Sequence, residues 1–220
     1  MTLSIIVLAA GQGKRMHSSL PKVLHRLAGR PLLAHVLQAA RALDPARTVV
    51  VHGHGGADVK SAFADADVTW IEQAAQQGTG HAVMQALPEI SLDDDVLILY
   101  GDVPLIEVGT LRRLVQAAQG GLAILSAQAP DPAGYGRVVR GAHGEVLRIV
   151  EQRDAGPAER ELSEVNAGFL CAPAKRLAKW LAEVRNHNAQ KEYYLTDVVA
   201  LAVSDGVAVA AVKARAWAEV

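Results

Sequence analysis

Short apolar runs alternate with longer helix-patterned stretches along this chain, and this alternation constrains the fold more than any other feature. Residues 5–8, 49–51 and 96–100 are continuous apolar runs, which is typical of strands buried on both faces of a parallel sheet. Residues 32–42 and 79–87 space their apolar side chains as helices do. Strands that alternate with helices predict an α/β fold with a mostly parallel central sheet covered by helices.

The pattern changes in the second half of the chain. Residues 137–140 and 145–150 flank the turn-forming segment 141–144, which predicts a hairpin and a small antiparallel region. The remaining segments predict strands at 68–71, 122–126, 165–171 and 207–212, and helices at 111–118, 174–184 and 195–204. We find no repeat and no clear linker, so residues 1–220 are expected to form one domain.

The charge balance excludes some partners. The chain has 22 basic and 23 acidic residues, a net charge of −1, which gives no electrostatic reason to expect binding to nucleic acid or to an anionic membrane. The longest uncharged stretch, 114–130, is interrupted by glutamines and glycines, so no membrane span is expected. The start lacks the pattern of a secretory signal. A single cysteine, Cys171, excludes an intrachain disulfide, and we expect a cytoplasmic protein.

A glycine-bearing loop follows the first strand at residues 9–13, and the cations Lys14, Arg15 and Lys22 come soon after it. Small residues allow backbone N–H groups to approach a phosphate closely. The dinucleotide pattern G-x-G-x-x-G fails because Met16 stands at the third glycine, and the P-loop pattern is absent. The segment predicts phosphate binding, and the alternative is a turn kept for packing.

Asp102 follows the buried run 96–100, and ligands of α/β sheets bind beyond the carboxyl ends of the strands. A carboxylate beside a triphosphate is a usual ligand of Mg²⁺. The alternative is an aspartate that caps the next turn. Residues 93–95, three aspartates before the strand, are expected to form a solvated loop.

Residues 73–81 form a polar segment between a strand and a helix. The amide of Gln73 offers both a donor and an acceptor, which suits the edge of a pyrimidine base. The alternative is an ordinary helix start with Thr79 as the cap.

Several motifs in order together resemble the sugar-nucleotide nucleotidyltransferases. They are LAAGQGKRM (8–16), LPKVL (20–24), QQGTGH (76–81), YGDVPL (100–105), GYGR (134–137), IVE (149–151) and NAQKEYYLTD (188–197). The combination resembles most the N-terminal uridyltransferase domains of the bacterial bifunctional enzymes that make UDP-N-acetylglucosamine. The resemblance implies a Rossmann-like, three-layer nucleotidyltransferase fold, with a nucleotide-binding part at about 1–110 and a sugar-binding part at about 111–220. It also implies Mg²⁺-dependent transfer of UMP from UTP to N-acetylglucosamine 1-phosphate, a precursor step for the cell wall.

The resemblance also assigns roles to residues. For uridine it implies the backbone of Leu8, Ala9, Ala10 and Gly11, with Gln73, Gly78 and Thr79. For the phosphates it implies Arg15 and Lys22 as catalytic residues, and for Mg²⁺ it implies Asp102. For N-acetylglucosamine it implies Tyr100, Gly101, Gly136, Glu151 and Asn166, with Tyr194 and Thr196 nearby.

This chain departs from the family pattern at three places. Ala167 stands where a hydroxyl residue is common, and Lys191 where glycine is common. Related chains continue to an asparagine that helps to hold Mg²⁺, and then to a left-handed β-helix that transfers acetyl groups and forms trimers. We therefore expect weak Mg²⁺ binding by these 220 residues, and acetyltransfer and trimer formation only in a longer chain.

The same motifs allow two alternative functions. A nucleotidyltransferase for another base or sugar would use the same chemistry, and a non-catalytic domain could bind a nucleotide sugar without reaction. The broken glycine pattern disfavours a dinucleotide oxidoreductase. His52 and His54 lack partners at the spacing of a zinc site. Trp180 and Cys171 lie in apolar patterns and are expected in the core.

Overall fold

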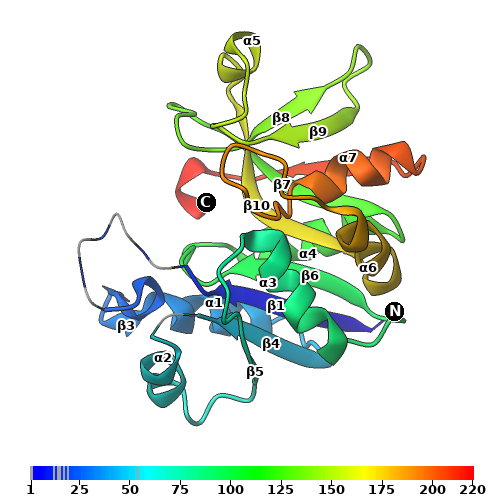
Figure 1. Cartoon of the computed structure of the whole chain (residues 1–220). Helices are drawn as coiled ribbons and strands as arrows, with labels where there is room; N and C mark the ends of the chain where they lie inside the picture. The colour runs from blue at the N-terminus through cyan, green and yellow to red at the C-terminus, as the bar shows by residue number, and fades with distance from the viewer. Residues whose placement is uncertain (1, 12, 14–15, 17, 19, 54) are drawn as a thin grey trace.

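The computed structural model describes residues 2–11, 13, 16, 18, 20–53 and 55–220, and its centre is a nine-stranded sheet (Figure 1). The strands of the sheet are β1 (Leu3–Ala9), β4 (Arg47–His52), β5 (Thr69–Glu72), β6 (Asp95–Tyr100), β7 (Leu122–Gln128), β8 (Arg137–Arg140), β9 (Val146–Val150), β10 (Glu164–Pro173) and β11 (Val209–Lys213). The helices are α1 (Leu32–Arg41), α2 (Gly56–Ala62), α3 (Thr79–Ala86), α4 (Val108–Ala118), α5 (Pro157–Arg160), α6 (Ala174–Glu183) and α7 (Asp197–Ser204). A separate two-stranded sheet joins β2 (Arg26–Leu27) to β3 (Arg30–Pro31).

The predicted helices and strands are confirmed, with ends that differ by a few residues. The sequence patterns did not indicate α2 or the pair β2–β3. Helix α2 has seven residues, and each strand of the pair has two, so neither is long enough to show a period.

The sheet separates two hydrophobic cores because neighbouring side chains on a strand point to opposite faces. In β1, Ile6 and Leu8 join one core, and Ile5 and Val7 join the other. The first core includes buried residues of α3, α6 and α7, and the second includes buried residues of α1 and α4. The result is the three-layer arrangement visible in Figure 1, and it confirms the predicted fold class.

One strand in the middle of the main path of the sheet runs against the others. The order is β11-β7-β10-β6-β1-β4-β5, and β10 pairs antiparallel with both β6 and β7. The remaining pairs along this path are parallel. The start of β10 therefore lies at the edge where β1, β4 and β6 end, which carries Asn166 to the edge where ligands of such sheets bind.

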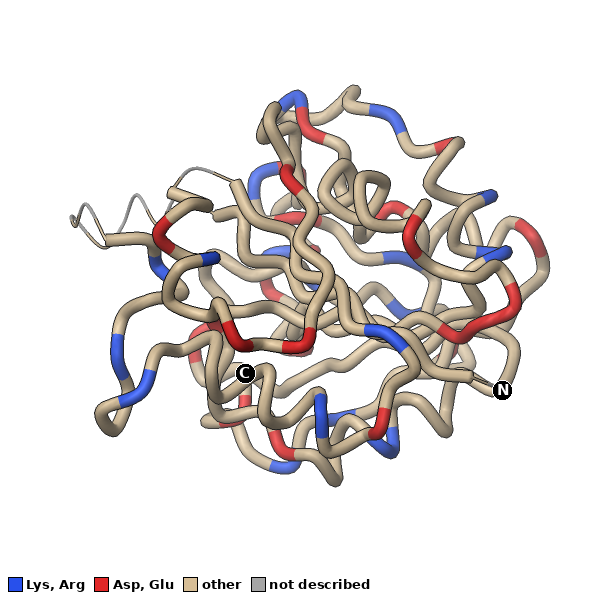
Figure 2. The backbone as a smooth tube through the Cα atoms, turned by 90° about the horizontal axis from the view of Figure 1, so that it is seen from below, with Lys and Arg blue, Asp and Glu red and all other residues tan. Residues whose placement is uncertain are grey.

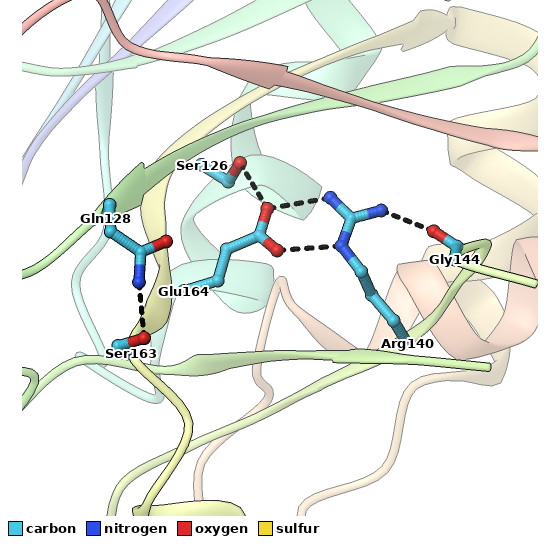
Figure 3. A network of polar contacts seen from close by, with 6 residues as sticks. All are labelled: Ser126, Gln128, Arg140, Gly144, Ser163 and Glu164. Atoms are coloured by element: carbon cyan, nitrogen blue, oxygen red, sulfur yellow. Dashed lines mark hydrogen bonds and ion pairs between the residues drawn. The ribbon is translucent and has the colours of Figure 1, made fainter. Parts of the chain in front are cut away.

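The hairpin β8–β9 is attached to the sheet by a polar network (Figure 3). Arg140 donates from Nε and Nη2 to the two carboxylate oxygens of Glu164, both at 2.7 Å, and the hydroxyl of Ser126 donates to Oε1 of Glu164 at 2.8 Å. The hydrogen bonds from Arg140 hold the pKa of the Glu164 carboxyl below its usual value. Burial acts to raise this pKa, and the hydrogen bond from Ser126 lowers it further. This network joins three strands, β7, β8 and β10.

The structure shows which of three groups of residues with a predicted exposure are buried: Trp180, Cys171 and the aspartates 93–95. Trp180 and Cys171 are buried, as predicted, and burial raises the pKa of the Cys171 thiol. The expected solvated loop of aspartates is wrong for Asp94, which is buried and accepts a hydrogen bond from the hydroxyl of Ser4 at 2.6 Å. Asp95 begins β6. Ser4 lies in β1, far away in the sequence, so the sequence pattern gave no sign of this partner.

Charged residues of both signs are distributed over the molecule rather than gathered on one side (Figure 2). None of the helices in the described part of the chain is both long and apolar enough to span a membrane.

Candidate active site

The ends of four parallel strands meet at one edge of the sheet and are linked by hydrogen bonds. The amide of Gly101, after β6, donates to the carbonyl of Leu8 in β1 at 2.9 Å. The side chain of Gln76, after β5, donates to the carbonyl of Ala10 at 2.9 Å. A β-carbon at Gly53, after β4, would lie 2.9 Å from the same carbonyl, so this position needs glycine. The predicted residues Leu8, Ala9, Ala10 and Gly101 are thus brought together.

Lys22 and Asp102 form an ion pair at this edge. Lys22 begins a short 3-10 turn, Lys22–Leu24, whose other two residues are buried, and Asp102 follows β6. The side chains of Lys22 and Asp102 keep 37% and 25% of their surface exposed, so a ligand can reach both. The predicted phosphate-binding lysine and the predicted metal-binding carboxylate are therefore in direct contact. Arg15, the other predicted catalytic residue, lies outside the described residues.

Asp102 is the predicted carboxylate that could bind a divalent cation here. Within the described part of the chain there is no group of three histidine, cysteine, aspartate or glutamate side chains arranged to hold a metal. A single carboxylate suits a cation that also binds phosphate oxygens and water, as Mg²⁺ does, rather than a cation held by protein ligands alone. At Gly11, no described atom outside its chain neighbours lies within 4 Å of an added β-carbon.

Gln73 is buried, and its amide is fixed in place. Its side-chain nitrogen bonds to the carbonyl of Gly78 at 2.9 Å and to Nδ1 of His81 at 3.0 Å. A cavity of about 690 Å³ lies beside it, between the ends of β4 and β5 and the start of α2, and among the described residues predicted to bind uridine Gln73 alone lines it. These contacts occupy both N–H donors of Gln73 and one of Gln76, so the amide oxygens of both side chains and the second N–H of Gln76 remain to recognise the edge of a nucleobase. His81 was assigned no partner from the sequence, since eight positions separate it from Gln73.

Thr79 does not cap α3, which corrects the alternative considered for this segment. The N-cap is Gly78, without a side-chain hydrogen bond, and the hydroxyl of Thr79 instead accepts from the amide of Leu195 at 3.1 Å. Gly78 has a φ of 104°, and a β-carbon there would lie 2.7 Å from the carbonyl of Tyr193. The start of α3 is thus attached to the segment 188–196, which carries Tyr194 and Thr196.

The predicted sugar-binding residues form a second group next to this edge. The amide of Asn166 donates to the carbonyl of Gly136 at 2.8 Å, and the hydroxyl of Thr196 donates to Oε1 of Glu151 at 2.8 Å. A β-carbon at Gly136 would lie 3.4 Å from Oε2 of Glu151, so glycine leaves the carboxylate accessible from that side. Residues far apart in the sequence, just before β8, just after β9, on β10 and just before α7, are thus linked by hydrogen bonds.

Tyr100 links the two groups of residues. A β-carbon at Gly168, where φ is 93°, would lie 2.8 Å from Cε2 of the Tyr100 ring, so the ring packs directly on the bulge of β10. Burial, followed by the charge of Glu151, raises the pKa of the Tyr100 phenol, and Asp102 also contributes. The phenol thus stays protonated and lies under the influence of both carboxylates.

Carboxylates gather around the predicted sugar-binding residues. Burial, then the charges of Glu151 and Asp154, raises the pKa of Asp197 to about 6. Burial also raises the pKa of Glu151 against the hydrogen bond from Thr196, with Asp154 and Glu192 adding to the rise. The hydroxyl of Tyr194 donates to Oδ2 of Asp154 at 3.2 Å. A group of carboxylate oxygens suits a ligand with several hydroxyl and N–H donors, such as an amino sugar.

Sequence reasoning missed the contributions of Gln76, Asp154 and Asp197. Gln76 and Asp197 lie inside motifs that were recognised, but no periodicity or spacing indicates which residue of a motif reaches the pocket. Asp154 lies in a turn after Glu151, whose carbonyl accepts from the amide of Asp154 at 2.9 Å. This turn could not be foreseen from the residue types.

The site combines a three-layer α/β sheet with a cation–carboxylate pair, fixed glutamine side chains and a group of carboxylates at the edge where ligands of such sheets bind. The comparison with known families identifies its class, which is that of the nucleotidyltransferases. The MobA-like NTP transferase domain matches residues 5–192. The chain belongs to this family.

Two curated relatives carry the description "Bifunctional protein GlmU". The relative from Chromobacterium violaceum is 56% identical over 208 residues, which are 94% of this chain and 46% of the relative. The relative from Cupriavidus taiwanensis is 56% identical over 217 residues, which are 98% of this chain and 48% of the relative. The chain thus spans about half the length of the curated relatives it matches, and the resemblance inferred from the motifs is confirmed.

A solved structure supports the fold alone. The crystal structure of a UDP-glucose pyrophosphorylase complexed with UDP-glucose matches 97% of this chain and 91% of its own, with a TM-score of 0.78 at 14% identity.

Proposed function

We propose that the chain transfers UMP from UTP to N-acetylglucosamine 1-phosphate, which gives UDP-N-acetylglucosamine and pyrophosphate. The observation that carries the proposal is the Lys22–Asp102 pair after β6, at the sheet edge where Gln73 follows β5, with the Glu151–Thr196 contact next to that edge. We also propose that the protein acts in the cytoplasm.

The reaction joins two polyanions. An ionised phosphate oxygen of the sugar phosphate forms a bond to the α-phosphorus of UTP, while the bond from that phosphorus to the bridging oxygen breaks and pyrophosphate leaves. The nucleophile is ionised at neutral pH, so the protein needs no general base. Alignment and neutralisation of charge are the main tasks. Lys22 supplies a point charge for the phosphates, and Arg15 a planar fork of donors.

Mg²⁺ would neutralise charge on the phosphates and would be bound by Asp102 together with phosphate oxygens and water. In the free protein Lys22 holds that carboxylate. A phosphate that binds Lys22 competes for the ammonium group and frees the carboxylate of Asp102. The residues present thus fit a cation that arrives together with the nucleotide.

The two ends of the product would be recognised by different parts of the chain. We propose that Gln73, Gly78 and Thr79, with the backbone of residues 8–11, bind the uridine, as part of a nucleotide-binding region at about 1–110. We propose that Glu151 and Asn166, with Gly136, Tyr194 and Thr196, bind the N-acetylglucosamine, as part of a sugar-binding region at about 111–220. Fixed polar groups reject analogues that cannot satisfy them.

The test is release of pyrophosphate from UTP and N-acetylglucosamine 1-phosphate, with Mg²⁺ and with a chelator. CTP, GTP and dTTP, and other sugar phosphates, are compared in the same assay. We expect activity that requires the divalent cation and prefers UTP. The variant Asp102→Asn should lower kcat by about 100-fold, as expected for loss of a charge that stabilises the transition state. The matched control Asp93→Asn changes an exposed side chain and should retain activity.

Two outcomes would contradict the proposal. Tight binding of UDP-N-acetylglucosamine without any release of pyrophosphate would identify a binding domain. A clear preference for another nucleotide or another sugar phosphate would identify a nucleotidyltransferase with the same reaction and different substrates.

A further inference from the structure

Arg137 is a buried arginine without a carboxylate partner among its hydrogen bonds. Its side chain is 2% exposed, at the start of β8. The guanidinium donates to the carbonyl of Tyr135, to Oε1 of Gln152 at 2.8 Å and to the carbonyl of Arg160 at 3.5 Å. All three acceptors are neutral. Its Nε–H is buried and has no partner within the described part of the chain. Buried charges are usually paired, so this arrangement carries a cost in folding free energy.

Two of the three acceptors belong to the segments that carry predicted sugar-binding residues, and the third, the carbonyl of Arg160, ends α5. Tyr135 precedes Gly136, and Gln152 follows Glu151. Oε1 of Gln152 also accepts from the amide of Gly134 at 3.2 Å, so it bridges the two segments. Gly136 in turn holds Asn166 through its carbonyl. The guanidinium therefore lies behind the surface that carries the predicted sugar-binding groups.

A planar guanidinium suits this place because its donors have fixed directions. A lysine offers the same charge without that geometry, and an apolar side chain of similar volume would avoid the cost of a buried cation. Arg137 thus sets the distance between the Gly134–Gly136 turn and the Glu151–Gln152 turn. Its burial keeps it from touching a ligand itself.

We infer that Arg137 is a positioning residue for the sugar-binding pocket, which holds Gly136 and Glu151 at the separation that the sugar of the substrate requires. The inference rests on the proposed function. It predicts that Arg137 affects the binding of the sugar phosphate. The binding of the nucleotide should not change, because the residues predicted to bind it lie at the ends of β1 and β5.

The test compares steady-state kinetics of wild type, Arg137→Lys and Arg137→Ala with both substrates varied. We expect KM for the sugar phosphate to rise by about tenfold or more in both variants, while KM for UTP changes by less than about twofold. Binding of UDP-N-acetylglucosamine, measured by calorimetry, should weaken by a similar factor. Millimolar guanidinium should restore KM for the sugar phosphate in Arg137→Ala because it can fill the space left by the side chain, and urea at the same concentration should not.

Arg176→Met is the matched control, since it removes an exposed arginine of α6 and should behave as wild type. If the Arg137 variants do not fold, Gln152→Leu is used, which removes the shared acceptor and leaves Arg137 in place. It should show the same split between the two KM values.

Equal changes in both KM values, or a loss of thermal stability with unchanged KM for the sugar phosphate, would overturn the inference and leave Arg137 a structural residue. Failure of the proposed function is distinguishable, because then the wild-type protein itself would not release pyrophosphate from these substrates.

Discussion

At the scale of single residues, a few backbone positions carry conformations that their side chains disfavour. Lys191 has a φ of 55° in the segment that leads to Tyr194 and Thr196. The side chain of Asn188 supports this turn by accepting from the amides of Gln190 and Glu192, at 3.2 and 3.1 Å. Left-handed backbone costs an ordinary L-residue about 1 to 2 kcal/mol and glycine much less. The structure thus explains why glycine is common here in the family that the motifs resemble.

We predict that Lys191→Gly raises the free energy of unfolding by about 0.5 to 1 kcal/mol, because relief of the left-handed backbone exceeds the added entropy of glycine in the unfolded chain. Urea denaturation provides the measurement. Lys191→Ala is the matched control, since it removes the charge and keeps the disfavoured φ. An equal gain from alanine would assign the effect to the charge rather than to the backbone.

At the scale of elements, the hairpin β8–β9 depends on polar contacts as well as on its strand pairing. Only Val165 of β10 pairs with β8, through Arg137. The Arg140–Glu164–Ser126 network supplies a further connection to β7 and β10 (Figure 3). Because Gly136 and Glu151 lie at the two ends of the hairpin that adjoin the pocket, the attachment of this hairpin also affects the site.

The lowered pKa of Glu164 makes the free energy of unfolding depend on pH in a defined direction. A carboxyl whose pKa is lower in the folded state stabilises the protein above its ordinary pKa, and this contribution is lost as the pH falls through the folded value. We predict that Glu164→Gln lowers the free energy of unfolding by about 1 to 2 kcal/mol at pH 7, reduced from the buried case because Arg140 is partly exposed. The difference from wild type should shrink below about pH 4. A difference that stays constant with pH would show that the charge of Glu164 does not contribute.

At the scale of the whole molecule, α3 and the segment 188–196 join the proposed nucleotide-binding and sugar-binding parts of the chain, in addition to the pairing of β6 with β10. The amide of Gly80 donates to the carbonyl of Tyr193 at 2.8 Å, and the amide of Tyr193 donates to the carbonyl of Gln77 at 2.8 Å. A β-carbon at Gly80 would lie 2.9 Å from the carbonyl of Tyr193. This close approach places the predicted uridine-binding segment against the segment that carries Tyr194 and Thr196.

We predict that Gly80→Ala lowers the free energy of unfolding by about 1 to 3 kcal/mol, because the methyl group separates the two segments. Gly109→Ala, also in a helix but with no described atom within 4 Å of the added carbon, should be neutral or stabilising by about 0.5 kcal/mol. Denaturant unfolding of both variants measures the contrast. Equal effects would mean that helix propensity, and not the contact, governs both positions.

The local elements could be predicted because they depend on local patterns. The apolar runs at 5–8 and 96–100 became strands buried on both faces, and the glycine turn at 141–144 became the hairpin. The candidate site residues were predicted through motifs, and the structure places the described ones at one edge of the sheet or next to it. Asp94, Thr79 and His81 were misjudged or left without partners because Ser4, Leu195 and Gln73 reach them only after the chain has folded.

The sequence by itself determined the class of fold and the chemical types at the site, since hydrophobic period and residue chemistry are properties of short segments. Only the tertiary structure decided that β10 runs antiparallel between β6 and β7, which carries Asn166 to the edge where Asp102 lies. It also decided that Lys22 meets Asp102 and that the buried Arg137 donates to Gln152, the residue after Glu151. These facts depend on packing between distant segments, because burial, pairing and the resulting shifts in pKa exist only when the sheet and its two cores have formed.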